Sequence, residues 1–295
     1  MSHHLATPIR RAALAIVLAI ALLMASVGAA HATGPQTTAQ RKCTSTYYNA
    51  LGQLGRVGSK AFAACLLLHA QGRLGELTLA DCVELPNERF DAAFGRVEAA
   101  LAKSCDGVDK DGLPKAPAFG TTEAPSALDL AIAAASGIFG GTAETFGFDL
   151  DEAFVDFATD KTLARCQLDV DRRQAACRAG YLATFAACAR TGLRGTPAKG
   201  IEPFVDAEDL ATCIGSDPKG RIARLCSRDG AIGTGFAKAC LGKGVDPALA
   251  VPACAATGAD ARDCISRVAN CHACLSVTAA ADLQPSACAP ACVAP

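Results

Sequence analysis

Residues 43–65 read CTSTYYNALGQLGRVGSKAFAAC, and residues 166–188 read CQLDVDRRQAACRAGYLATFAAC. Both stretches begin and end with cysteines 22 positions apart, and both end in Phe-Ala-Ala-Cys. Further along, Leu-Ala-Asp-Cys at 79–82 matches Leu-Ala-Thr-Cys at 210–213. These matches predict an internal duplication, in which the second copy begins 123 residues after the first (166 minus 43).

Apolar spacing predicts that each copy is helical. Apolar residues in the first long stretch recur at steps of four and three, the spacing of one helix face, and the same spacing starts again after Pro86-Asn87. A third apolar segment covers Ser126 to Phe139, and its counterpart in the second copy is Asp260 to Ser276. In the second copy, Asp217 and Pro218 predict the start of the second helix, as N-cap and first helical residue. We expect an all-α fold of duplicated, disulfide-stapled units, each a helical hairpin closed into a three-helix unit. The stripe of the first long helix comprises Cys43, Tyr47, Ala50, Leu54, Val57, Ala61, Cys65 and Leu68.

The N-terminus has the features of a secretory signal peptide. Arg10 and Arg11 precede an apolar run from Ala12 to Val27, and Ala30-His31-Ala32 fits the small-residue rule for cleavage. The run is shorter than the ~20 residues that span a bilayer, so we expect Sec-type export and cleavage after Ala32. The expected organisation is a signal peptide (1–32), a flexible N-terminus (33–41), a first helical unit (42–145), a linker (146–160), a second helical unit (161–280) and a cysteine-containing tail (281–295).

Composition indicates the compartment and limits the partners. All 16 cysteines follow the signal peptide, and an even number in an exported chain indicates disulfide bonds. Cleavage removes two of the 28 basic residues and none of the 29 acidic ones, which leaves a net charge of −3. Nucleic acid and anionic membranes are bound mainly through clustered Lys and Arg, so neither is an expected partner. The most apolar later segment, Leu128–Phe139, contains Asp129, so we expect no membrane span in the mature chain, which should be secreted or periplasmic.

Helix register predicts five of the disulfide bonds. In an antiparallel hairpin the start of one helix faces the end of the other, and the interval 43–65 spans 22 residues while 82–105 spans 23. The intervals 177–188 and 213–226, of 11 and 13 residues, match in the second copy. The predicted bridges are Cys65–Cys82, Cys43–Cys105, Cys188–Cys213, Cys177–Cys226 and Cys166–Cys240. The other six cysteines should pair among themselves in a pattern that spacing leaves open: Cys254, Cys264, Cys271, Cys274, Cys288 and Cys292.

Candidate catalytic and metal-binding residues are few. Only His69 and His272 remain after cleavage, which limits histidine-dependent catalysis and multi-histidine metal sites, and His69 is expected to be an ordinary residue at a helix end. The motif Cys271-His272-Ala273-Cys274 lacks the histidine directly after its second cysteine that c-type haem attachment needs. With Cys264 on the same helical face, its two cysteines form an alternative thiol site for disulfide exchange or metal binding. Structural disulfides are the favoured interpretation of all three residues.

Acidic stretches match ion-binding motifs only in part. Asp109-Lys110-Asp111-Gly112 resembles the middle of a calcium loop, but Gly107 and Ala118 stand at the first and twelfth ligand positions, so we expect a polar turn. There is no Trp, no glycine-rich phosphate loop and no nucleophile-elbow serine. The sequence therefore assigns no catalytic residue, cofactor or metal. Four carboxylates between the copies are expected at a helix start: Asp149, Asp151, Glu152 and Asp156.

The cysteine spacing also resembles that of a known group of proteins. Matching features are the long helix with cysteine at both ends (42–65 and 165–188), the Leu-Ala-x-Cys segment, and the closing run from Asp263-Cys264-Ile265 to Cys271-His272-Ala273-Cys274-Leu275. In these features the chain resembles uncharacterised, secreted, cysteine-rich helical-repeat proteins of environmental bacteria. The resemblance covers most of the mature chain and implies a helical-repeat fold and an extracytoplasmic location, without an activity. A departure is the segment 126–139, which lacks the cysteines of its counterpart.

These observations favour a non-enzymatic exported protein. The leading hypothesis is a disulfide-stabilised helical scaffold that acts through contact with another protein. The identity of that partner and the oligomeric state of the chain are left open. The alternative is a thiol-based metal-binding or disulfide-exchange protein that uses the C-terminal cysteines. An enzyme with an unfamiliar carboxylate site is the third hypothesis.

Overall fold

The computed structural model describes residues 36–84, 87–116, 124–195 and 202–281, with Cys288 and Cys292, all within one compact unit. The predicted signal peptide (1–32) and most of the tail lie outside these residues. Over the described ranges the fold is all-α, as predicted, and no strand forms. The long helices are α2 (Thr38–Ala70), α4 (Glu88–Cys105), α5 (Ala127–Phe146), α7 (Phe157–Gly192) and α13 (Ala261–Ala281); the short ones are α3 (Leu79–Glu84), α6 (Leu150–Ala153), α8 (Ala207–Ser216), α9 (Arg221–Cys226), α10 (Ala231–Ala239), η3 (Leu241–Lys243), α11 (Pro247–Ala250) and α12 (Pro252–Ala256).

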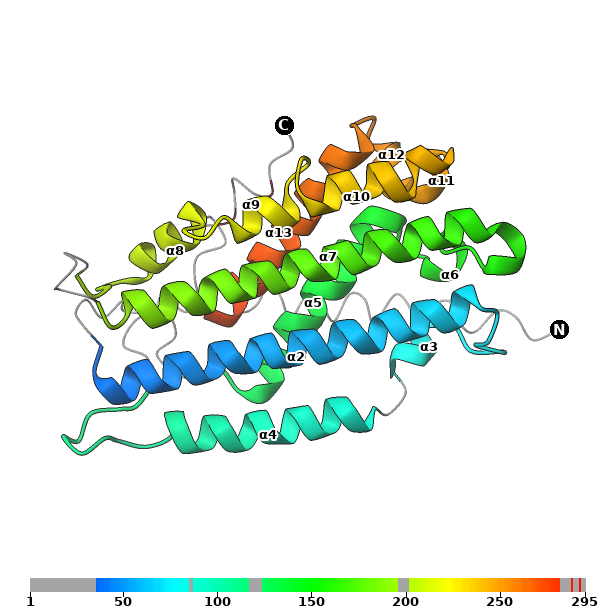
Figure 1. Ribbon diagram of the computed structural model, residues 1–295. Coiled ribbons are helices and arrows are strands. Elements are labelled where there is room, and N and C mark those ends of the chain that lie inside the picture. Colours follow the sequence, from blue (N-terminus) through cyan, green and yellow to red (C-terminus); the bar gives the residue numbers. More distant parts are fainter. Residues whose placement is uncertain are drawn as a thin grey trace. The chain divides into compact units, whose positions relative to one another are not determined.

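The first hairpin consists of α2, α3 and α4. Figure 1 shows α4 running beside α2, and α3 lying close to the end of α2. Asn87 caps α4 by accepting from the backbone N–H groups of Arg89 and Phe90, at the start that Pro86-Asn87 predicts. The expectation of a flexible segment over 33–41 is wrong from Gln36 onward. Thr37 and Gln40 form a capping box that starts α2 at Thr38, because each side chain satisfies a backbone N–H of the other.

In the second hairpin, α7 pairs with three short helices in place of one continuous helix. The 36-residue α7 is interrupted at Asp160, whose carboxylate accepts from the N–H groups of Thr162 and Leu163 and so caps the long part of the helix. Its partners α8, α9 and α10 lie along it in turn (Figure 1). The expected helix start at Asp217-Pro218 is wrong. Asp217 ends α8 in the left-handed conformation (φ 40°), and its carboxylate reaches forward to the first turn of α9, which begins three residues after Pro218.

The segment between the hairpins is also more ordered than a linker. Within 146–160, Asp149 caps the short helix α6 and Asp156 caps the start of α7. Two acidic N-caps so close together convert the expected linker into helix starts. The carboxylates of 149–156 therefore lie where the sequence predicts them, at helix starts.

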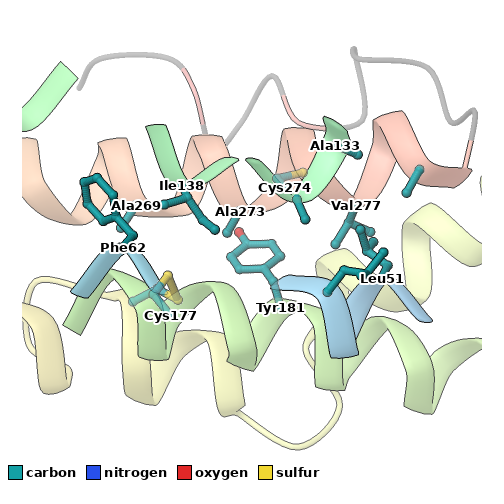
Figure 2. Packing of buried hydrophobic residues seen from close by; sticks show 14 of the residues in the cluster. Leu51, Phe62, Ala133, Ile138, Cys177, Tyr181, Ala269, Ala273, Cys274 and Val277 are labelled. Atoms are coloured by element: carbon teal, nitrogen blue, oxygen red, sulfur yellow. A yellow bond between two sulfur atoms is a disulfide. The ribbon is translucent and has the colours of Figure 1, made fainter. Parts of the chain in front are cut away.

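Four long helices meet in the centre of the unit. Helix α2 packs along α7, α5 packs on α2, α13 packs on α7, and α5 packs on α13. Figure 2 shows the apolar side chains that they contribute, among them Leu51, Ile138 and Ala273. Both hairpins therefore share one hydrophobic core.

Glycines let α5 approach α13 closely. A Cβ atom on Gly137 would lie 1.8 Å from Oγ of Ser276 and 3.2 Å from the backbone oxygen of His272. A Cβ atom on Gly140 would lie 2.6 Å from the His272 ring. A side chain at Gly140 would displace the His272 ring, and one at Gly137 would displace the Ser276 hydroxyl and press on the α13 backbone, so these glycines permit the close spacing of the two helices.

Candidate functional site

The ten cysteines of the two hairpins form the five pairs that helix register predicts. Each bridge ties a long helix to its partner rod, with Cα–Cα distances from 4.7 Å at Cys43–Cys105 to 5.9 Å at Cys188–Cys213. The antiparallel helices bring these positions level, which is why equal spacing along the sequence identifies them. The pairs are Cys43–Cys105, Cys65–Cys82, Cys166–Cys240, Cys177–Cys226 and Cys188–Cys213.

The alternative thiol site is distributed over three separate bridges. Cys264 pairs with Cys254, while Cys271 and Cys274 pair with two cysteines of the tail. The two cysteines of the Cys-x-x-Cys motif are therefore bonded to different partners and not to each other, which does not favour an exchange site at this motif. The tail bridges, Cys271–Cys292 and Cys274–Cys288, complete a set of eight that uses all 16 cysteines.

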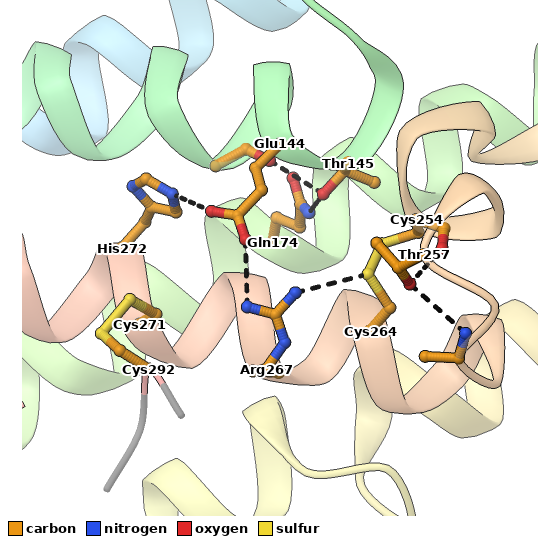
Figure 3. Close-up of polar contacts among 12 residues, drawn as sticks. Glu144, Thr145, Gln174, Cys254, Thr257, Cys264, Arg267, Cys271, His272 and Cys292 are labelled. Atoms are coloured by element: carbon orange, nitrogen blue, oxygen red, sulfur yellow. Dashed lines mark hydrogen bonds and ion pairs between the residues drawn. A yellow bond between two sulfur atoms is a disulfide. The ribbon is translucent and has the colours of Figure 1, made fainter. Parts of the chain in front are cut away.

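His272 takes part in a polar contact between α5 and α13. Its Nε2 lies 2.8 Å from Oε2 of Glu144, and Arg267 donates to the other carboxylate oxygen at 3.0 Å (Figure 3). Burial acts to raise the pKa of Glu144, but hydrogen bonds from His272 and Arg267 outweigh it, and the net shift is downward. The nearby Ser276 hydroxyl donates to the backbone oxygen of His272 at 2.8 Å, so it is not positioned on the imidazole as a nucleophile. This contact joins two helices and offers no recognisable catalytic set.

His69 is likewise an interhelical contact. It lies in the last turn of α2, as expected, but its side chain is only 18% exposed. Its Nε2 lies 2.9 Å from the backbone oxygen of Phe154, and its Nδ1 lies 3.8 Å from Asp151. Asp151 also accepts from the N–H of Leu79 at 2.8 Å. Rather than an ordinary surface residue, His69 is part of the junction between α2, α3 and α6.

The calcium-like sequence forms a polar turn, as predicted. Oδ1 of Asp109 accepts from the N–H groups of Asp111 and Leu113 at 2.9 and 3.0 Å, so this carboxylate is used within the turn. Over the described part of the chain, no group of three or more His, Cys, Asp or Glu side chains is placed to hold a metal ion.

Sequence analysis misses a line of buried polar residues on α7, which we call the polar seam: Gln167, Asp171, Gln174 and Arg178. All four are at most 6% exposed. Their spacing of four, three and four is the helical stepping used above for apolar residues, and this spacing is the signal that could have revealed them. A buried polar side chain needs a partner, so each member indicates either a structural tie or a site.

The first member of the seam is a structural tie. The amide oxygen of Gln167 accepts from the N–H of Val155 at 2.9 Å, and its amide nitrogen donates to the backbone oxygen of Ala153 at 2.7 Å. Gln167 thereby holds the end of α6 against α7. Gln174 donates to Oγ1 of Thr145 on α5 at 2.6 Å (Figure 3), but its own amide oxygen has no partner among the described residues.

The two charged members of the seam are only partly compensated. Burial raises the pKa of Asp171 to about 6, against an opposing effect of Arg178. Burial lowers the pKa of Arg178, and Asp171 acts in the opposite direction. One oxygen of Asp171 and two nitrogens of Arg178, Nε and Nη2, have no hydrogen-bond partner in the described part of the chain. Such unsatisfied buried charge is unusual and points to a missing partner near Arg178.

Among the helices of the described ranges, none combines the length and apolar character needed to cross a membrane.

Known proteins give no independent assignment of the residues described above. The roles of the cysteines and of the polar seam are therefore argued from their geometry. Comparison with known proteins finds no matching family model, no matching curated protein and no matching solved structure.

Proposed function

We propose that this chain is an exported, non-enzymatic helical scaffold that acts by contact with another protein. The observation that carries the proposal is that all 16 cysteines are bonded, in eight bridges that involve every long helix except α5. Each native bridge contributes typically ~2–4 kcal/mol, mainly by restricting the unfolded chain. A protein held in this way suits an environment without chaperones or reductants.

An extracytoplasmic location follows from the same bonds. Disulfides in this number belong to an oxidising compartment, because cytosolic thiols are kept reduced. The N-terminal Arg10-Arg11, apolar run and Ala30-His31-Ala32 supply the matching export signal in our proposal. Support for a non-enzymatic role comes from His69 and His272, both of which are engaged in contacts between helices.

We infer in addition that the two hairpins descend from one duplicated unit. Support comes from equivalent bridges: Cys43–Cys105 corresponds to Cys166–Cys240, and Cys65–Cys82 to Cys188–Cys213. The packing is equivalent too, since α5 packs on α2 as α13 packs on α7. The bridge Cys177–Cys226 has no counterpart in the first hairpin.

The surface of α5 is the contact face that we propose. Leu128 and Ile132, one turn apart, are 59% and 49% exposed on a helix whose opposite side is buried. Exposed apolar side chains on adjacent turns of one helix suit recognition by a partner protein. A photo-crosslinking side chain at Ile132 should yield one discrete adduct with a partner from the native compartment, and one at Glu98 on α4 should not. Equal labelling from both positions would contradict this assignment.

Thiol titration of the exported, unreduced protein tests the scaffold against its alternative. The scaffold predicts essentially no reactive thiol before reduction, even in denaturant, and all sixteen after reduction. Two reactive thiols assigned to Cys271 and Cys274 would instead support disulfide exchange or metal binding at the C-terminal motif.

A further inference from the structure

A cavity of about 190 Å³ lies where α2, α5, α7 and α13 meet. Its walls are mainly apolar and are formed by Leu51, Ala134, Ile138, Leu182 and Ala273. Figure 2 labels three of these residues, Leu51, Ile138 and Ala273, on three different helices. A site whose walls come from four helices that pack on one another is pre-formed for a ligand.

Arg178 is the buried charged residue of the cavity lining. The side chain lines the cavity and is only 6% exposed, and two of its nitrogens, Nε and Nη2, have no partner among the described residues. Asp171, two turns earlier on α7, favours the charged form of Arg178. However, no ion pair within 4.0 Å joins Arg178 to an acidic side chain of the described ranges. A buried guanidinium keeps its charge and retains a strong demand for an anion.

The entrance to the cavity is basic as well. Arg56 and Lys60, on adjacent turns of α2, are exposed and line the cavity, and none of its lining residues is acidic. The lining also includes the hydroxyl groups of Ser59 and Ser276. Two cations at the mouth and one at depth attract an anion toward the interior.

We propose that this cavity binds a small monocarboxylate with an apolar body. The carboxylate pairs with the guanidinium of Arg178, and the apolar body lies between Leu51 and Ile138. A guanidinium matches a carboxylate in two parallel hydrogen bonds, and the apolar walls disfavour a ligand that is polar throughout. A cavity of ~150 Å³ holds benzene, so this one accommodates benzoate or a short fatty acid and is too small for drug-sized ligands.

This site goes beyond the scaffold role and does not depend on it. Acetate, butyrate, hexanoate and benzoate are titrated into the mature, disulfide-intact protein by calorimetry, with benzamide as the uncharged analogue of benzoate. We expect saturable binding of benzoate or hexanoate, at least tenfold tighter than that of acetate and benzamide. Absence of saturation by all four acids at millimolar concentration, or equal affinity for benzoate and benzamide, would overturn the proposal while leaving the scaffold untouched.

Two variants test the position of the site. Arg178→Met removes the cation and should weaken benzoate binding at least tenfold, whereas Arg96→Met, on the exposed face of α4, should leave it unchanged. Gly55→Leu places a larger side chain in the cavity and leaves Arg178 unsubstituted, and the added Cβ atom would make ordinary contacts, with Leu182 at 3.4 Å and Ala134 at 4.0 Å. It should abolish binding without lowering the melting temperature, because leucine favours the helix more than glycine does. Benzoate bound by Gly55→Leu as by the unsubstituted protein would place the ligand elsewhere and refute the proposal.

Discussion

The bridge Cys177–Cys226 offers the sharpest test of how the disulfides stabilise the fold. In the duplication that we infer, Leu54 occupies the position equivalent to Cys177 (177 minus 123), and it is fully buried without a bridge. The double variant Cys177→Leu/Cys226→Ala therefore replaces one buried apolar pair by another. We expect the helices to persist and the free energy of unfolding to fall.

The expected loss follows from the loop that the bridge closes. A loop of 49 residues, taken alone, corresponds to about 4 kcal/mol of chain entropy in the unfolded state. Cys188–Cys213 already closes the inner part of this loop and leaves 11 residues on one side and 13 on the other. A loop of that combined length corresponds to about 3 kcal/mol, which is the loss that we expect.

Guanidinium unfolding under non-reducing conditions, followed by far-UV circular dichroism, measures this loss. With an m value of about 3–6 kcal/mol/M for a chain of this size, the midpoint should fall by about 0.5–1 M. An unchanged midpoint would refute the entropic account, and loss of the native helical signal would refute the equivalence of the two hairpins.

Three further predictions concern single side chains. Because burial raises the pKa of Asp171 to about 6 from an ordinary value of 3.8, the folded state binds more protons than the unfolded state between these pH values, and stability should fall as pH rises through this window. Asp171→Asn should flatten this dependence of stability on pH and raise the free energy of unfolding by about 2–3 kcal/mol at pH 7. Chemical unfolding at a series of pH values measures both effects, and an unchanged slope would contradict the raised pKa of Asp171. Gly137→Ala should destabilise the protein by about 1–2 kcal/mol, because the added methyl group overpacks against α13. Gly95→Ala, whose methyl group meets nothing within 4 Å, should stabilise it slightly in the same thermal melts. Equal effects of the two substitutions would contradict the close approach of α5 to α13. Thr37→Ala should cost about 0.5–2 kcal/mol by removing the cap that Gln40 completes, and hydrogen exchange should increase in the first turn of α2 only.

The helices and disulfide bridges could be predicted because both leave a regular spacing of residues along the sequence. Steps of three and four identify a helix whatever packs against it, and equal intervals between cysteines identify level positions in an antiparallel hairpin. Thus the pairing of Cys43 with Cys105 needs no knowledge of the rest of the molecule. Turn chemistry was less secure. The sequence Asp217-Pro218-Lys219-Gly220 reads equally well as a helix start or as a turn, and the left-handed Asp217 selects the turn.

The polar seam and the cavity could not be predicted in the same way. Asp171 and Arg178 have helical spacing, but whether that face of α7 meets solvent or other helices depends on how α5 and α13 cross it. The close approach of those two helices depends in turn on Gly137, whose role appears only when Ser276 is placed opposite. Sequence spacing describes the faces of each helix, whereas the site is formed where four helices meet.

Peptide mapping of the exported, unreduced protein by mass spectrometry tests the central claim most directly. The account predicts eight bonds, with Cys65 joined to Cys82, Cys177 joined to Cys226, and no free thiol. A bond between Cys271 and Cys274, a different partner for Cys65, or a majority of reduced cysteines would contradict it.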